Sequence, residues 1–322
     1  MGRSQGQVPM IAGRRLSRRL ITGSAGLLII CSAVILGPYL LGEGPPSDPA
    51  HSALAPPGTM LRVLELHDGR TLVSPSVTTT GDLLIVDGPY SLEEIPKSAV
   101  SSSRIVRSWL GTDRYGRDLL RLMLKGGRLS LMITGLGALI SLIAGLAVGL
   151  GAATGGRWID ALLMRGVDAL MAFPTLLLLI LCAAVLDPGP ATLVVLLGLT
   201  SWMGLARLVR GQVLSVRERQ FVMAARVAGT PWYRVWSWHF LPEIRGPVAQ
   251  DVALRLGDLV LAEATLSYLG LGLPPTTPTW GLLVSEGHRV MMDAWWPATL
   301  PGLAIASLVI CFALIGDGIQ EL

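Results

Sequence analysis

The chain has 322 residues, of which 51% are hydrophobic and 15% are charged, and its formal net charge is +4. Soluble proteins carry about 25% charged residues, so this composition indicates a membrane protein, and the small positive charge does not require a nucleic-acid partner. Neither lysine stands in a G-x-x-x-x-G-K-[ST] sequence, and the histidines and scattered cysteines match no metal-binding spacing. We therefore expect no P-loop, no cofactor, no metal and no catalytic residue in this chain.

Apolar stretches predict an all-α polytopic membrane protein. A helix needs about 20 mostly apolar residues to cross the hydrocarbon core of a bilayer. The candidate spans are 20–41, 129–154, 162–186, 188–206, 247–272 and 294–315. The fifth candidate differs from the others because it contains charged residues. We expect six transmembrane helices.

The first candidate span has a second interpretation. Arg18-Arg19 before an apolar run is also typical of a twin-arginine signal sequence. Such a signal has an apolar run of about 7–15 residues followed by a small-residue cleavage site. Here the run has 22 residues and no A-x-A sequence follows it. We favour a first span that is not cleaved.

Arginine in the short connections predicts the orientation of the spans. Five arginines lie in the tail 1–19, two (Arg157 and Arg165) at the junction of the second and third spans, and seven in the stretch 207–246. The third–fourth connection has none, and the fifth–sixth connection, 273–293, has one. We therefore expect both tails, 1–19 and 316–322, and the stretch 207–246 in the cytoplasm.

Residues 42–128 predict a small β-rich outer insertion. The sequence "LRVLELHDGRTLVS" alternates around Asp68-Gly69, which is typical of a two-residue hairpin turn, and "GDLLIVDGPY" indicates another strand. The region ends in "GTDRYGRD", whose acids suggest either a cation site or a turn that caps a helix. We favour the turn, because no EF-hand spacing is present. The residues of this outer-side element are Gly111, Thr112, Asp113, Gly116, Arg117 and Asp118.

The segment "RERQFVMAARVAGTPWYRVWSWHFLP", 217–242, is basic and rich in alanine and tryptophan. Placed on a helix, it has one apolar face with Phe221, Ala224, Ala225 and Ala228, opposite Arg219 and Arg226. Gly229 is expected to end this helix, and Thr230-Pro231 to begin a second one. We predict a compact knob of two helices. The alternative, an amphipathic helix lying on the lipid surface, would not need the sharp corner.

The spacing A-A-x-x-x-G…L-P in this segment resembles the EAA loop of ABC importer permeases. In that family the loop forms a coupling helix that docks into a groove of the cytoplasmic ATPase. A methionine replaces the usual glutamate, so a salt bridge from that position is not implied. The resemblance implies a coupling site made of Arg219, Phe221, Met223, Ala224, Ala225, Arg226, Ala228, Gly229, Thr230, Leu241 and Pro242.

Further blocks at 110–131, 155–178 and 263–287 are similar, in the same order, to the peptide/nickel-type permeases. The match is closest to the second ("C") permease subunit of dipeptide/oligopeptide importers. It implies the six-helix permease (MetI-like) fold and the bacterial cytoplasmic (inner) membrane. It also implies a homologous second permease subunit as heterodimer partner, two ABC ATPases that bind ATP and Mg, and an extracytoplasmic substrate-binding protein. Peptides are the implied cargo, with nickel or another small solute as the alternative.

Charged residues in the fifth span suggest a second site. Asp251, Arg255 and Asp258 lie within about 60° of one another on a helix. Ionisable groups inside a membrane usually face the bundle interior or water. These residues are either part of the translocation path or an ion pair within the helix, and the sequence leaves both open.

Two other functional classes remain as alternatives. An ATPase-independent channel or secondary transporter would leave the predicted knob unexplained. An intramembrane serine protease, with Ser267 as its nucleophile, would lack a G-x-S-x-G sequence and a histidine base within a span. The permease interpretation is therefore the one that we carry forward.

Overall fold

The structure is a computed structural model that describes residues 17–41, 44–274 and 276–321. At positions 226, 232, 233, 237 and 239 it describes the backbone alone. Most of the expected tail 1–19 and the side chain of Arg226 therefore lie outside the described residues.

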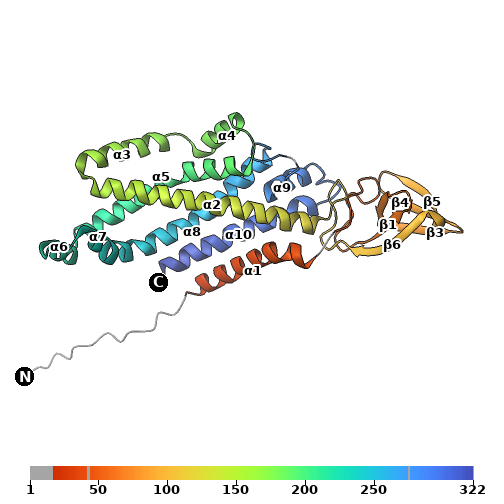
Figure 1. The fold of residues 1–322 in the computed structure, drawn as a ribbon, viewed down its shortest axis with the longest axis horizontal. Coiled ribbons are helices and arrows are strands. Elements are labelled where there is room, and N and C mark those ends of the chain that lie inside the picture. The colour runs from red at the N-terminus through yellow and green to blue at the C-terminus, as the bar shows by residue number, and fades with distance from the viewer. Residues whose placement is uncertain (1–16, 42–43, 275, 322) are drawn as a thin grey trace, which may run out of the picture.

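Long helices lie side by side along the longest axis of the molecule (Figure 1). They are α1 (Arg18–Leu40), α2 (Leu119–Thr154), α5 (Pro190–Arg217), α8 (Leu241–Tyr268) and α10 (Trp296–Gln320). The small sheets stand at one end of this bundle, and the short helices α6 (Gln220–Val227) and α7 (Trp232–Val235) stand at the other. The all-α membrane fold with a β-rich insertion is thus confirmed.

Among the described residues, four helices (α1, α2, α5 and α10) are long and apolar enough to cross a membrane. The pair α3 (Gly156–Met171) and α4 (Thr175–Val185) adds a fifth candidate if it is counted as one broken span. Helix α8 has 28 residues but does not qualify by composition, because four charged side chains lie between Asp251 and Glu263. The count of six spans therefore stays a prediction.

The expected third span, 162–186, is not one continuous helix. Helices α3 and α4 meet at an angle of 79°, and Pro174 is the residue that precedes α4. Proline lacks a backbone N–H and disfavours helical geometry in the residue before it, so a helix ends there readily. The proline produces a sharp break at this position rather than a gentle bend.

Other helices extend beyond the apolar stretches. Helix α2 begins ten residues before the expected position 129, with Asp118 accepting a hydrogen bond from the Arg121 N–H (3.0 Å). Helix α5 continues to Arg217, past the expected end at 206. The expected outer loop 273–293 contains α9 (Trp280–His288). Apolar runs mark only the part of a helix that fits in lipid, whereas charged residues such as arginine also favour helices.

Glycines allow α2 and α5 to pack closely. A Cβ atom on Gly145 would lie 2.8 Å from the side chain of Leu205, and one on Gly149 would lie 2.8 Å from Cβ of Val209. Small residues at such contacts let membrane helices approach. The G-x-x-x-G spacing on α2 therefore serves helix packing.

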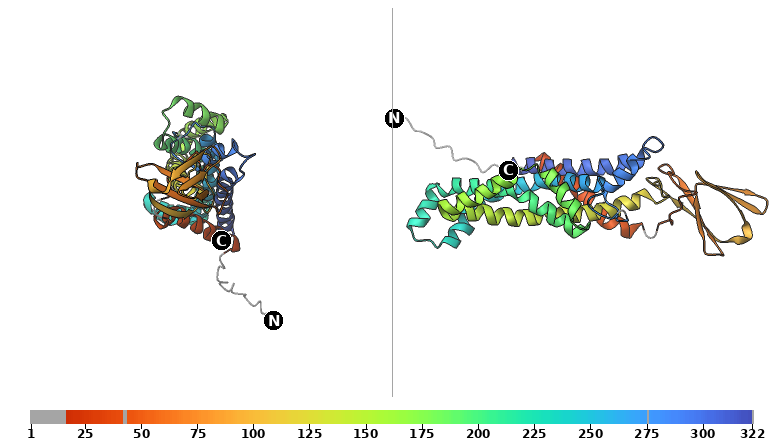
Figure 2. Two further views of the ribbon diagram at one scale, coloured as in Figure 1. Left: turned by 90° about the vertical axis from the view of Figure 1, so that its right-hand side faces the viewer. Right: turned by 90° about the horizontal axis from the view of Figure 1, so that it is seen from above.

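The outer insertion contains two three-stranded antiparallel sheets. One has the order β2-β1-β6, with β1 (Met60–Leu66), β2 (Thr71–Ser74) and β6 (Val100–Arg107). The other has the order β3-β4-β5, with β3 (Ser76–Thr80), β4 (Leu83–Asp87) and β5 (Leu92–Pro96), and a short turn η1 (Lys97–Ala99) follows it. The expected hairpin forms between β1 and β2, where Gly69 has φ +86°. Figure 2 shows this insertion as a separate unit beyond the helix ends.

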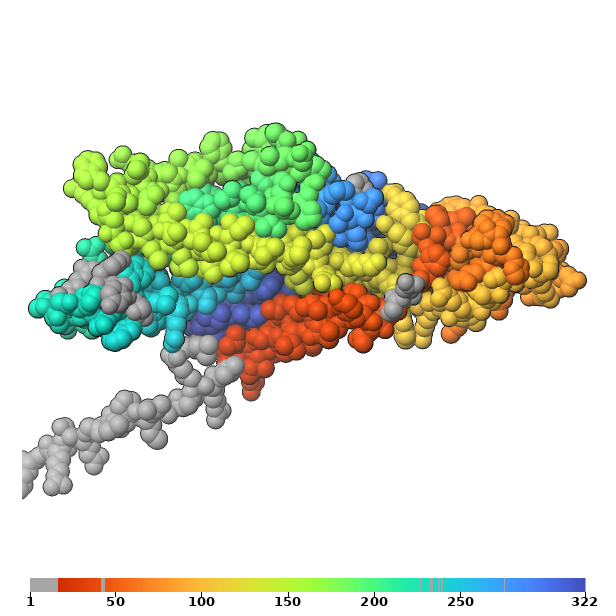
Figure 3. All heavy atoms as spheres, viewed as in Figure 1, coloured from red at the N-terminus to blue at the C-terminus, as the bar shows by residue number. Residues whose placement is uncertain are grey.

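Two depressions interrupt the bundle surface. One lies between α4, α5 and α8. The other lies between α1, α2, α8 and α10, and in the space-filling view α8 and α10 are visible in the furrow that separates α2 from α1 (Figure 3).

Candidate functional site

The end of the bundle opposite the sheets carries a knob, which we define as α6, α7 and the π-helical turn η2 (Trp236–Phe240). Helix α6 ends at a glycine corner. Gly229 has φ +72°, a left-handed conformation that favours glycine, and the Thr230 N–H donates to the Ala225 carbonyl (3.0 Å). This six-to-one hydrogen bond is characteristic of a Schellman motif. The chain can therefore reverse tightly between the two helices of the knob.

The knob is fixed to the bundle by one face of α6. Val222 is 0% exposed and, with Val235 and Phe240, packs against the valines at the end of α5. Ala225 packs partly buried against the same cluster. The expected apolar face, which grouped Ala225 with Phe221, Ala224 and Ala228, is therefore wrong for Ala225, because this residue faces the bundle. Val222, which helical spacing alone did not indicate, is the main anchor.

The opposite face of the knob is exposed and mostly apolar. Its exposed apolar residues are Phe221, Met223, Ala224, Val227, Ala228 and Gly229, and Leu241 and Pro242 at the start of α8 are exposed as well. Val227 is 90% exposed. Arg219 borders this surface, and its Nη1 lies 2.7 Å from the Glu243 carboxylate. An exposed apolar patch with a small-residue surface is suited to receive another protein.

On α8 the structure pairs two of the three charged candidates. Arg255 forms an ion pair with Asp251, one turn away, and its Nη1 donates to the Ser201 carbonyl of α5 (2.8 Å). Asp251 and Arg255 thus form an ion pair within the helix, as one of the two interpretations expected. Asp258 is exposed and is not part of this pair.

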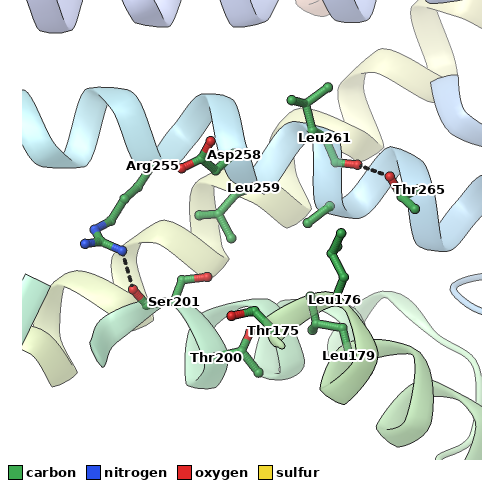
Figure 4. A pocket seen from close by; sticks show the side chains of 11 residues that line it. Thr175, Leu176, Leu179, Thr200, Ser201, Arg255, Asp258, Leu259, Leu261 and Thr265 are labelled. Carbon is green, nitrogen blue, oxygen red and sulfur yellow. Dashed lines mark hydrogen bonds between the residues drawn. The ribbon is translucent and has the colours of Figure 1, made fainter. Parts of the chain in front are cut away.

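A cavity of about 360 Å³ lies next to these charges (Figure 4). Its polar lining consists of Thr175 from α4, Thr200 and Ser201 from α5, and Arg255, Asp258 and Thr265 from α8. Leucines of α4 and α8, together with Ala262 of α8, complete the wall. One cation, one anion and four hydroxyl groups therefore border a single depression at the side of the bundle.

Glu263, five residues after Asp258 on α8, is a charged residue that was not among the predicted site residues. It is 1% exposed, and the Ser267 hydroxyl donates to its Oε1 (2.7 Å). Ser267 is itself 2% exposed and engaged in this bond. Its geometry is that of a hydrogen-bonding partner inside the bundle, which does not support a role as nucleophile.

The outer-side element forms a clasp between the insertion and the bundle. The Asp113 carboxylate accepts from the N–H groups of Tyr115 and Arg117 (both 2.9 Å). The Arg117 guanidinium then reaches both Asp113 (2.6 Å) and Glu286 of α9 (2.8 Å). Burial acts to lower the pKa of Arg117, but its contacts with these two carboxylates outweigh burial and raise the pKa.

The remaining residues of this element are also engaged in structure. Thr112 is buried, and its hydroxyl accepts from the Ala55 N–H (2.8 Å) and donates to the Ser52 carbonyl (2.6 Å). Gly111 and Gly116 have φ of +80° and +68°. Within the described ranges, no group of three or more histidine, cysteine or acidic residues is arranged to hold a metal ion. Asp118 caps the start of α2, so the structure favours a turn that caps a helix over a cation site at this element.

Comparisons with known proteins give consistent results. Residues 141–322 match the family model described as "Binding-protein-dependent transport system inner membrane component". A putative peptide transport system permease protein of Brucella suis is 41% identical over 211 residues, which cover 66% of this chain and 71% of that protein. The dipeptide transport system permease protein DppC of Alkalihalophilus pseudofirmus is 31% identical over 283 residues, covering 87% of this chain and 93% of that protein.

One solved structure, an inward-facing conformation of the MetNI methionine ABC transporter, is similar with a TM-score of 0.52. The likeness covers 61% of this chain and 93% of the other, at 17% sequence identity. It therefore shows a shared fold for the helical part of the molecule.

Proposed function

Because the chain belongs to the family of inner membrane components of binding-protein-dependent transport systems, and is a permease subunit of an ABC importer, we propose that it carries peptides across the cytoplasmic membrane. The relatives at 31% and 41% identity are named for dipeptide and peptide transport. Those names favour peptides over nickel or another small solute.

The cavity between α4, α5 and α8 supports this cargo. Arg255 and Asp258 place opposite charges on the same wall, among hydroxyl groups from three helices. A peptide has a cationic amino end, an anionic carboxyl end and backbone groups that need hydrogen bonds. In our proposal this cavity is the contribution of the chain to the translocation path.

The knob supports a coupling role. In our proposal its exposed surface docks into a cytoplasmic ABC ATPase, and two such ATPases bind ATP and Mg and supply the energy. Ala224 of α6 and Ala228 next to the Gly229 corner are exposed, while Val222 fixes the helix to the bundle. This division between an anchored and a free face is what a mechanical contact requires.

The other partners follow from the same proposal. A homologous second permease subunit completes the translocation unit, and a substrate-binding protein delivers the peptide at the outer side. We place the knob in the cytoplasm and the sheets outside, because the arginine-rich connections gather at the knob end. Both chain termini are then cytoplasmic.

Uptake of a radiolabelled dipeptide tests the cargo. A strain that lacks the chromosomal copy of this gene is complemented with wild type or with an empty plasmid, and dipeptide and nickel uptake are measured in parallel. Dipeptide uptake restored by wild type, without a change in nickel uptake, is the expected result. Restoration of nickel uptake alone would replace the cargo but leave the permease assignment intact.

A further inference from the structure

The groove between α1, α2, α8 and α10 is separate from the cavity that we assign to the cargo. Its volume is about 510 Å³, and it lies in the half of the bundle that is nearer to the knob. Its residues on α8 run from Leu241 to Leu256, whereas those of the cargo cavity run from Arg255 to Thr265. The groove and the cavity that we assign to the cargo therefore share no lining residue and lie mostly at different levels of α8.

The lining of this groove is apolar except for one residue near its knob-side end. Leucine, isoleucine, valine, alanine and phenylalanine side chains form the walls, and Arg245 is the one charged residue among those that line it. From Arg245 to Leu256 the helix rises about 16 Å. Half of a hydrocarbon core of about 30 Å is about 15 Å, so the stretch of the groove from Arg245 to Leu256 has the length of one leaflet.

Arg245 lacks a counter-charge in the described part of the chain. It is exposed at the first turns of α8, and none of the ion pairs of the structure includes it. Acids beside it on α8 and at the end of α10 are already engaged: Glu243 pairs with Arg219 (2.7 Å), and Asp317 and Glu321 pair with Arg19 (3.6 and 3.3 Å). An unpaired guanidinium at the mouth of an apolar groove is complementary to a molecule with one anionic end and an apolar body.

We propose that this groove binds an anionic phospholipid of the knob-side leaflet, with its phosphate on Arg245 and an acyl chain along α8. Contacts between membrane helices usually involve small residues, as Gly145 and Gly149 of α2 show against α5. The groove instead presents branched side chains, and Ala249 and Ala253 are its only small residues among those that line it. A flexible acyl chain fits such an uneven surface better than a second helix does.

Lipid retention by the assembled importer tests this proposal. The complex is purified with its partner subunits, reconstituted in nanodiscs of equal phosphatidylglycerol and phosphatidylcholine, and transferred to detergent for native mass spectrometry. Wild type is compared with Arg245→Gln, which removes the charge, and with Ala249→Phe, which fills the groove at an exposed position. Arg157→Gln is the matched control, because Arg157 is an exposed arginine on α3, away from the groove.

Wild type and Arg157→Gln are expected to retain phosphatidylglycerol in preference to phosphatidylcholine. Arg245→Gln should lower phosphatidylglycerol retention about fivefold, which is the effect of one basic side chain at an anionic surface. Ala249→Phe should lower retention of both lipids. Equal retention in wild type and Arg245→Gln, or an equal loss in Arg157→Gln, overturns the proposal. So does disulfide cross-linking of an Ala249→Cys variant to the second permease subunit, because protein would then cover the groove.

Discussion

Val222 and Val227 stand on the same short helix and face in opposite directions: Val222 is 0% exposed and Val227 is 90% exposed. Five residues on a helix correspond to a rotation of about 140°, so one side chain reaches the bundle while the other points to solvent. The pair separates the anchoring face of the knob from its free face.

This pair gives a first prediction. Val222→Asp places a carboxylate in an apolar cluster without a partner, and we expect it to destabilise the protein by about 4 kcal/mol or more and to lower the assembled amount. Val227→Asp should leave the amount unchanged but reduce ATPase retention, because the charge falls on the face that we propose docks into the ATPase. Membrane-fraction immunoblots and co-purification measure the two effects. If both variants behaved alike, the assignment of the two faces would be wrong.

Gly229→Val should separate the permease from its ATPases. A non-glycine residue in the left-handed region is strained by about 1–2 kcal/mol, and a β-branched one more, so the corner of the knob should open. We expect an inserted protein that loses ATPase subunits during affinity purification. Gly211→Val is the control, because Gly211 lies within α5 with an ordinary φ and open space around it. Full ATPase retention by Gly229→Val would contradict the coupling role.

Asp258→Leu should impair dipeptide uptake without lowering the amount of protein. Asp258 is exposed in the cargo cavity and belongs to no ion pair that the structure describes, so its removal leaves no buried partner uncompensated. Asp251→Leu should instead lower the amount, because the mostly buried Arg255 would lose its charge partner. Uptake is measured per unit of protein detected in the membrane. Normal uptake by Asp258→Leu would remove this residue from the translocation path.

The Arg117–Glu286 contact should stabilise the outer clasp. Both side chains are mostly buried, at 29% and 15% exposure, and each loses a charged partner when the other is replaced. We expect Arg117→Ala to lower the midpoint of thermal denaturation in detergent, with a coupling of about 1–3 kcal/mol to Glu286→Ala in a double-mutant cycle. Arg70→Ala is the control, because Arg70 pairs with Glu93 on the exposed surface of the sheets. Additive effects of the Arg117 and Glu286 replacements would show that the contact does not act as a clasp.

The sequence by itself determined the class of the protein. Apolar runs of bilayer length predicted a helical membrane protein, Asp68-Gly69 predicted the hairpin, and the Gly229-Thr230-Pro231 corner predicted the knob. These features depend on neighbours in the chain: hydropathy over one span, and backbone freedom at one or two residues. They could be predicted without knowing which distant segments of the chain pack against them.

Only the tertiary structure decided which surfaces face which neighbours. Helical spacing placed Ala225 with the other alanines, but the valines of α5, far away in the sequence, make that side of α6 face inward. The cavity beside Arg255 and Asp258 depends on α4, α5 and α8 lying together, and the pairing of Arg255 depends on the Ser201 carbonyl as well as on Asp251. Burial, counter-charges and cavities arise from contacts between distant segments. A local pattern specifies a helix and its faces, and packing decides which face is buried.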